Sequence, residues 1–226
     1  MIRRALFAIG CACCLVSLVD AQAPGSRIGT IEVAGGGGLF GGGSLGQRDA
    51  NLRANGTTPA PYRLFTTDSS FGRSLLLEGR VGMGISRRVA IEGRFGFSRP
   101  ELRTSVSSDA EQGNATVAVE RIDQYMIDGS GIIALERLRW RDVVPFAAAG
   151  AGYVRQVHEG QTLIESGHSY HIGGGVRRGL FTHPRGAVKA GGLRADARLY
   201  LLSGGVAFDT ATRARVAVSG AMFFRF

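Results

Sequence analysis

The chain has 226 residues and a formal net charge of +9, with 44% hydrophobic and 20% charged residues. This length suits a single domain, and 35 glycines with only 6 prolines indicate a strand-rich chain rather than a disordered one. A basic balance is typical of nucleic-acid-binding proteins, so the distribution of the charge along the chain has to decide its meaning.

The first residues have the layout of a secretory signal peptide. MIRRALFAIGCACCLVSLVDAQAP starts with a basic pair, continues with an apolar run and ends at small residues. We therefore predict a signal peptide over residues 1–21, cleaved after Ala21 or Ala23, and one mature domain over 24–226. The three cysteines all lie within 11–14, so the predicted mature chain has no disulfide, catalytic thiol or thiolate metal site.

Beyond the leader, apolar residues recur at every second position. In 74–86, SLLLEGRVGMGIS, Leu75 and Leu77 share one face, whereas Glu78 and Arg80 share the other. This alternation is typical of a β-strand between two different environments. Eight segments show it: 27–36, 74–86, 89–97, 124–135, 144–155, 169–178, 193–201 and 216–226.

The position of the charges indicates which face is the interior. Charges of both signs stand near the middle of the strands, on the face opposite the apolar residues, whereas a soluble barrel has an apolar interior. The strands also match the roughly 9 to 11 residues that a tilted membrane strand needs. We therefore predict an all-β fold, an eight-stranded antiparallel up-and-down transmembrane β-barrel. The predicted interior charge network consists of Glu32, Glu78, Arg80, Glu92, Arg94, Asp128, Arg155, Asp196 and Arg198.

The predicted connectors alternate in length, which suits the same fold. The long ones are 41–70, 98–116 and 156–168, the short ones are 86–88, 136–143 and 182–186, and 203–213 is intermediate. Outer-membrane barrels have long external loops and short periplasmic turns, so both termini are expected in the periplasm. Basic residues gather in the short turns, where they can meet anionic phospholipid headgroups. Nucleic acid is not needed to explain the charge.

Four segments resemble the strands of a known family. They are VPFAAAGAGYVR at 144–155, GGGVRR at 173–178, LRADARLYL at 193–201 and VSGAMFFRF at 218–226. They are similar to strands of small bacterial outer-membrane β-barrel proteins, the OmpA/OmpX-like group of Gram-negative bacteria. The resemblance implies a monomer in the outer membrane among its lipids. It also implies that Phe224 and Phe226 form the insertion signal read by the barrel assembly machinery.

Several functions remain open at this point. The leading prediction is a non-enzymatic barrel with an envelope-structural or surface-loop interaction role. The alternatives are a secreted lipocalin-like carrier of a hydrophobic ligand, a small channel, and a lipid-modifying enzyme using Ser169 with His168 or His171. We predict no cofactor and no metal, because the four histidines lack a completing ligand spacing. Side chains fill the interior of an eight-stranded barrel, so wide-pore transport is not expected.

Overall fold

The computed structural model describes residues 28–52, 62–107, 115–159, 163–183, 185–206 and 211–226. The predicted signal peptide over 1–21 and both candidate cleavage sites lie outside these residues.

Most of the described residues belong to β-strands. These are β1 Ile31–Phe40, β2 Gly43–Leu52, β3 Tyr62–Phe71, β4 Ser74–Gly84, β5 Val89–Ser98, β6 Glu101–Ser107, β7 Ala115–Ala134, β8 Val143–His158, β9 Ile164–Thr182, β10 Ala190–Gly204 and β11 Arg213–Arg225. A short 3₁₀ turn, η1, spans Glu136–Leu138. In the described part of the chain, no helix is long and apolar enough to cross a membrane.

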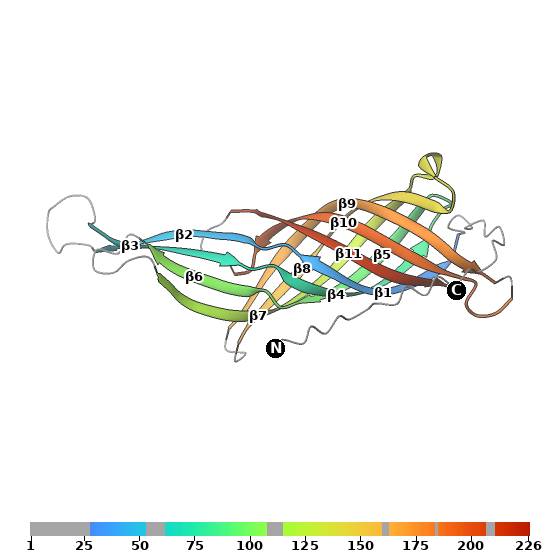
Figure 1. Cartoon of the computed structure of the whole chain (residues 1–226). Coiled ribbons are helices and arrows are strands. Elements are labelled where there is room, and N and C mark those ends of the chain that lie inside the picture. Colours follow the sequence, from blue (N-terminus) through green and yellow to red (C-terminus); the bar gives the residue numbers. More distant parts are fainter. Residues whose placement is uncertain (1–27, 53–61, 108–114, 160–162, 184, 207–210) are drawn as a thin grey trace, which may run out of the picture.

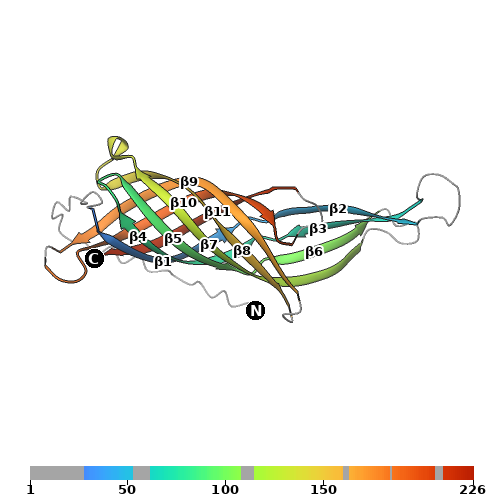
Figure 2. The same ribbon diagram turned by 180° about the vertical axis from the view of Figure 1, so that it is seen from behind.

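Eight of these strands close into a barrel, in the order β1-β4-β5-β7-β8-β9-β10-β11 (Figures 1 and 2). The ring closes where β1 pairs antiparallel with β11, with Glu32 opposite Arg225 and Phe40 opposite Ala217. β7 and β8 pair on the far side of the ring, from Ile122 opposite His158. Closure removes the free strand edges that an open sheet would present along the barrel wall. The predicted eight-stranded antiparallel barrel is confirmed.

The other three strands extend the barrel at one end. β2, β3, β6 and the first part of β7 form a four-stranded sheet that projects beyond the ring (Figure 1). The prediction of loops over 41–70 and 98–116 was wrong for these parts. Both faces of the extension carry polar, exposed residues, for example the successive residues Gln47 and Arg48 of β2. Its few buried apolar residues, Leu45, Phe71 and Leu102, lie at its base, so no apolar alternation runs along these strands to mark them.

The connector predicted over 156–168 is also mostly strand. β8 continues to His158 and β9 starts at Ile164, with Val157 opposite Ile164. The barrel therefore has an extended end, which carries the projecting sheet. We call the opposite end the terminal end, because Phe226 lies there with η1 and the β4–β5 and β9–β10 connections (Figure 2).

The wall of the barrel has an apolar outer face and a polar inner face. Along β4, Leu75 and Leu77 are 76% and 63% exposed, whereas Glu78 and Arg80 are 7% and 3% exposed. This orientation is the reverse of the one that a lipocalin-like carrier needs, because its ligand would bind against an apolar interior.

Candidate functional site

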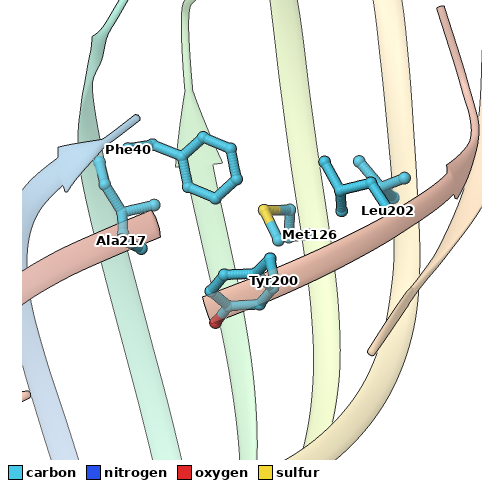
Figure 3. Packing of buried hydrophobic residues seen from close by; sticks show 7 residues of the cluster. Phe40, Met126, Tyr200, Leu202 and Ala217 are labelled. Atoms are coloured by element: carbon cyan, nitrogen blue, oxygen red, sulfur yellow. The ribbon is translucent and has the colours of Figure 1, made fainter. Parts of the chain in front are cut away.

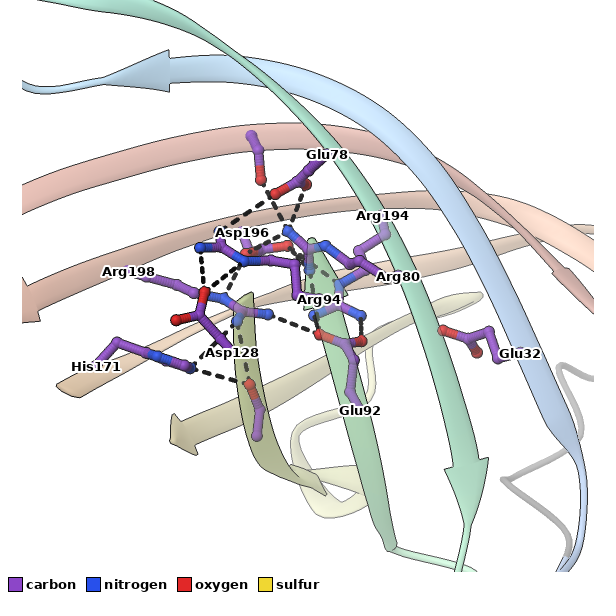
Figure 4. Close-up of polar contacts among 12 residues, drawn as sticks. Glu32, Glu78, Arg80, Glu92, Arg94, Asp128, His171, Arg194, Asp196 and Arg198 are labelled. Atoms are coloured by element: carbon purple, nitrogen blue, oxygen red, sulfur yellow. Dashed lines mark hydrogen bonds and ion pairs between the residues drawn. The ribbon is translucent and has the colours of Figure 1, made fainter. Parts of the chain in front are cut away.

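The interior of the barrel holds a central charge network of four arginines and four carboxylates (Figure 4). Its members are Arg80, Arg94, Arg194, Arg198, Glu78, Glu92, Asp128 and Asp196. Each of these side chains is at most 3% exposed, and they come from β4, β5, β7 and β10. The formal charges cancel within the network, which is what burial of so many ions requires.

Asp196 and Glu92 join most of the arginines. Asp196 accepts hydrogen bonds from Arg80 Nη1 at 2.9 Å and from the Nε atoms of Arg194 and Arg198, both at 3.1 Å. Glu92 accepts from Arg198 Nη2 at 2.9 Å and from both Nη atoms of Arg194. Charge-assisted bonds of this kind are roughly twice as strong as neutral ones, so these two carboxylates tie β4, β5 and β10 together across the lumen.

A second part of the network lies towards β7. Arg94 donates from Nε and Nη2 to one Asp128 oxygen, at 3.0 and 2.5 Å. The Ser169 hydroxyl donates to the other Asp128 oxygen at 2.8 Å. Glu78 bridges the two parts, because it accepts from Arg80 at 2.5 Å and from Arg94 at 3.4 Å.

Two inner glycines of β8 make room for this packing. A Cβ on Gly150 would stand 2.8 Å from the His171 ring, and one on Gly152 would collide with Asp128. Any larger residue at these positions would push the buried groups out of register.

An apolar cluster closes the lumen towards the extended end (Figure 3). Its members are Phe40, Leu76, Met126, Val154, Tyr200, Leu202 and Ala217. The Tyr200 ring is fully buried, with its centroid 5.7 Å from that of Phe40 and 5.0 Å from the Arg94 guanidinium. The cluster therefore lies directly against the charge network.

A smaller ion group lies at the mouth of the terminal end. Glu32 accepts from Arg225 Nε at 2.9 Å and pairs with Arg177 at 3.2 Å. The Phe146 ring lies beneath this mouth, with the guanidiniums of Arg177 and Arg194 at 5.0 and 4.5 Å from its centroid. Side chains thus occupy the lumen from the mouth to the apolar cluster.

No protein-family model matches the chain, and no curated protein matches it. Among solved structures, it is similar to the crystal structure of the outer membrane protein OprG from Pseudomonas aeruginosa, with a TM-score of 0.50 and 10% sequence identity. The match covers 90% of this chain and 98% of that chain. The chain has the fold of an outer-membrane β-barrel protein. The finer OmpA/OmpX-like resemblance stays a prediction.

The outer-membrane barrel fold places most of the predicted network residues inside. Seven of them lie in the central network, and Glu32 lies at the mouth. The predicted interior position of Arg155 is wrong, because its side chain is exposed on the outer wall next to Tyr153, which is 44% exposed. Phe146 and Val154 instead point inward, at 3% and 1% exposure. Small alanine and glycine residues occupy both faces of β8, so the sequence does not show which face points into the barrel.

Sequence reasoning also missed Arg194 as a network member. It stands two residues before Asp196 on the same face of β10, and the same spacing separates Asp196 from Arg198. The period of two alone was enough to place it inside. His171 and Ser130 were missed in the same way, and the Ser130 hydroxyl lies 3.0 Å from His171 Nε2.

The residues considered for lipid chemistry lie apart from the outer rim. Ser169 is fully buried and donates to Asp128, whereas His171 bonds to Ser130. His168 points outward and packs against Tyr153, with 6.1 Å between ring centroids. A buried hydroxyl engaged with a carboxylate cannot reach a lipid ester. Among the described residues, no group of three or more histidine, cysteine, aspartate or glutamate side chains is placed to hold a metal ion.

Proposed function

We propose that this protein is an integral outer-membrane barrel with a closed lumen, which acts without catalysis as an envelope-structural and surface-display protein. The observation that carries the proposal is the pairing of an apolar outer wall with a neutralised, side-chain-filled interior. A barrel has charged residues on its inner face and apolar residues on its outer face when lipid surrounds the outer face. The shared fold with OprG supports the same location.

The orientation follows from the two ends. We assign the terminal end to the periplasm and the extended end to the outside, because bacterial barrels keep short turns in the periplasm. The four-stranded extension then stands beyond the membrane with polar side chains on both faces. Because this sheet projects beyond the ring, we assign the interaction role to it.

The C-terminal strand supports assembly by the barrel assembly machinery. Phe224 and Phe226 point outward and are 36% and 40% exposed, while Phe223 points inward and is buried. The backbone N–H of Phe226 donates to Ile31 at 2.9 Å, so the last residue is held in the closing seam. Outward aromatic side chains at a barrel end suit the membrane interface.

Two measurements test the proposal. Purified protein should migrate differently on gels before and after boiling, and should require detergent for solubility. In planar bilayers it should give no discrete conductance steps, with a known porin as the positive control for the membrane. Recovery as a detergent-free periplasmic protein would contradict the membrane location, and reproducible conductance steps would contradict the closed lumen.

A further inference from the structure

The outer wall of the barrel is not uniform, because a groove of about 660 Å³ runs across β1, β4, β5 and β7. Apolar side chains of Val81, Met83 and Ile91 line it, together with Gly93 and Gly129. Its volume lies within the roughly 300 to 1,000 Å³ typical of small-molecule sites. These strands can be followed together in Figure 2.

The barrel itself does not need the groove to be empty of side chains. A Cβ added to Gly129 would meet nothing within 4 Å, and one on Gly93 or Gly131 would meet only a backbone oxygen at 3.9 or 4.0 Å. Glycine weakens a strand interior and often marks a place where a ligand approaches the backbone. Larger residues stand above this floor, with Phe95 opposite Ile127 in the next outward row.

The groove opens towards a strongly basic part of the terminal rim. Ala134, three residues beyond Gly131, donates its N–H to the Arg88 carbonyl at 2.8 Å, which joins the β4–β5 turn to the end of β7. The exposed cations of this basic rim are Arg87, Arg88, Arg137, Arg139 and Arg141. Glu136 and Asp142 are the acidic residues of the same two connections, and Arg88 Nε lies 3.7 Å from Glu136.

An exposed aromatic side chain stands in the same rim. Trp140 is 70% exposed, and the Arg141 guanidinium lies 5.4 Å from its ring centroid. Tryptophan is enriched where a membrane surface meets water.

We infer that the groove and the basic rim together bind one anionic phospholipid of the periplasmic leaflet. An acyl chain occupies the apolar groove, and the phosphate lies among the rim arginines. Charge complementarity favours this occupant. An anionic headgroup matches the excess of guanidiniums in the basic rim, and the adjoining apolar groove matches the acyl chain of the same lipid. The inference rests on the proposed membrane location.

The test uses full-length mature protein in detergent, incubated with equal amounts of phosphatidylglycerol and phosphatidylcholine and examined by native mass spectrometry. Wild-type protein should retain phosphatidylglycerol in preference to phosphatidylcholine. Gly129→Leu fills the groove and should lose the lipid-bound peak. Gly35→Leu is the matched control, since a Cβ there also meets nothing within 4 Å but Gly35 does not line the groove; it should keep the lipid.

The headgroup contribution is tested separately. The double variant Arg87→Gln/Arg88→Gln should bind both lipids equally, whereas Arg48→Gln/Arg63→Gln, on the extended end, should keep the preference. Retention of lipid by G129L, or no preference in wild-type protein, would overturn the inference. A dimer peak lost in G129L would also overturn it and would assign the groove to a second copy of the chain.

Heat-modifiable migration of each variant separates the two proposals. Wild-type protein that shows it but retains no lipid refutes only this inference. Protein that neither shows it nor enters vesicles refutes the membrane location and the lipid site together.

Discussion

At the residue scale, Asp196 accepts hydrogen bonds from more arginines than any other carboxylate of the central network. It accepts from three arginines, of which Arg80 comes from a strand more than 100 positions away in the sequence. Its side chain is 3% exposed, so its charge is stable only because those partners are in place. Loss of the Asp196 charge would leave three buried guanidiniums with one anionic partner fewer.

We expect Asp196→Asn to lower the free energy of unfolding by about 3 to 5 kcal/mol, the cost typical of breaking a buried ion pair. The measurement is the urea midpoint of protein refolded into lipid vesicles. Asp123→Asn serves as control, because Asp123 pairs with Arg99 at 2.6 Å on the surface. That pair is worth about 0 to 1 kcal/mol. Equal midpoints for D196N and wild type would refute the role assigned to the network.

A second residue-scale prediction concerns Phe226. The alanine variant keeps the backbone bond to Ile31, which does not involve the ring. We therefore expect Phe226→Ala to refold in detergent like wild type, but to assemble more slowly in cells, measured as the heat-modifiable fraction after a pulse of synthesis. Phe181→Ala, in the β9–β10 region, is the control for loss of an aromatic ring. Normal assembly of F226A would remove the insertion-signal proposal.

At the element scale, the extension is built from strands that the barrel does not need for closure. Phe40 at the end of β1 already pairs with Ser74 at the start of β4. The chain leaves the ring after Phe40, runs through β2 and β3, and returns to the ring at Ser74. A separate apolar cluster, with Leu45 and Phe71 among its members, packs the base of the extension.

Replacement of residues 41–73 by a short turn should therefore leave a closed barrel. We expect the shortened protein to keep its heat-modifiable migration, because each barrel pairing is retained. Its urea midpoint should fall, since Leu45 and Phe71 leave the cluster that also contains Leu102. Failure of the shortened chain to fold would show that the hairpin takes part in barrel formation.

At the scale of the whole molecule, the proposed orientation gives opposite accessibility to the two ends. The predicted mature chain has no cysteine, so single cysteines can be introduced as reporters. Arg48 on the extension and Arg185 at the terminal end are both exposed. They are therefore a matched pair of sites.

On intact cells, a membrane-impermeant maleimide should label Arg48→Cys and should not label Arg185→Cys. After permeabilisation of the outer membrane, both should react. The physical reason is that an inserted barrel holds its two ends on opposite sides of the lipid. The reverse pattern would invert the topology, and labelling of both on intact cells would contradict a sealed insertion.

Much of the wall was determined by the sequence alone. The apolar alternation of 74–86, 89–97 and 193–201 predicted the outer and inner faces, because a strand side chain points to one side or the other at a period of two. The same local rule placed Glu78, Arg80 and most of the other network residues inside.

Only the tertiary structure decided which groups meet. Arg80 on β4 and Asp196 on β10 meet across the lumen, because β4, β1, β11 and β10 follow one another in the closed ring. No local sequence pattern shows that two residues so far apart in the chain are in contact. The inward face of β8, and with it the outward position of Arg155, depends on pairing with β7 and β9. The extension buries only a few apolar side chains at its base, so no apolar period runs along its strands. Only their pairing in the structure revealed them. Local alternation thus determines a side chain's face, whereas its neighbours follow from closure of the barrel.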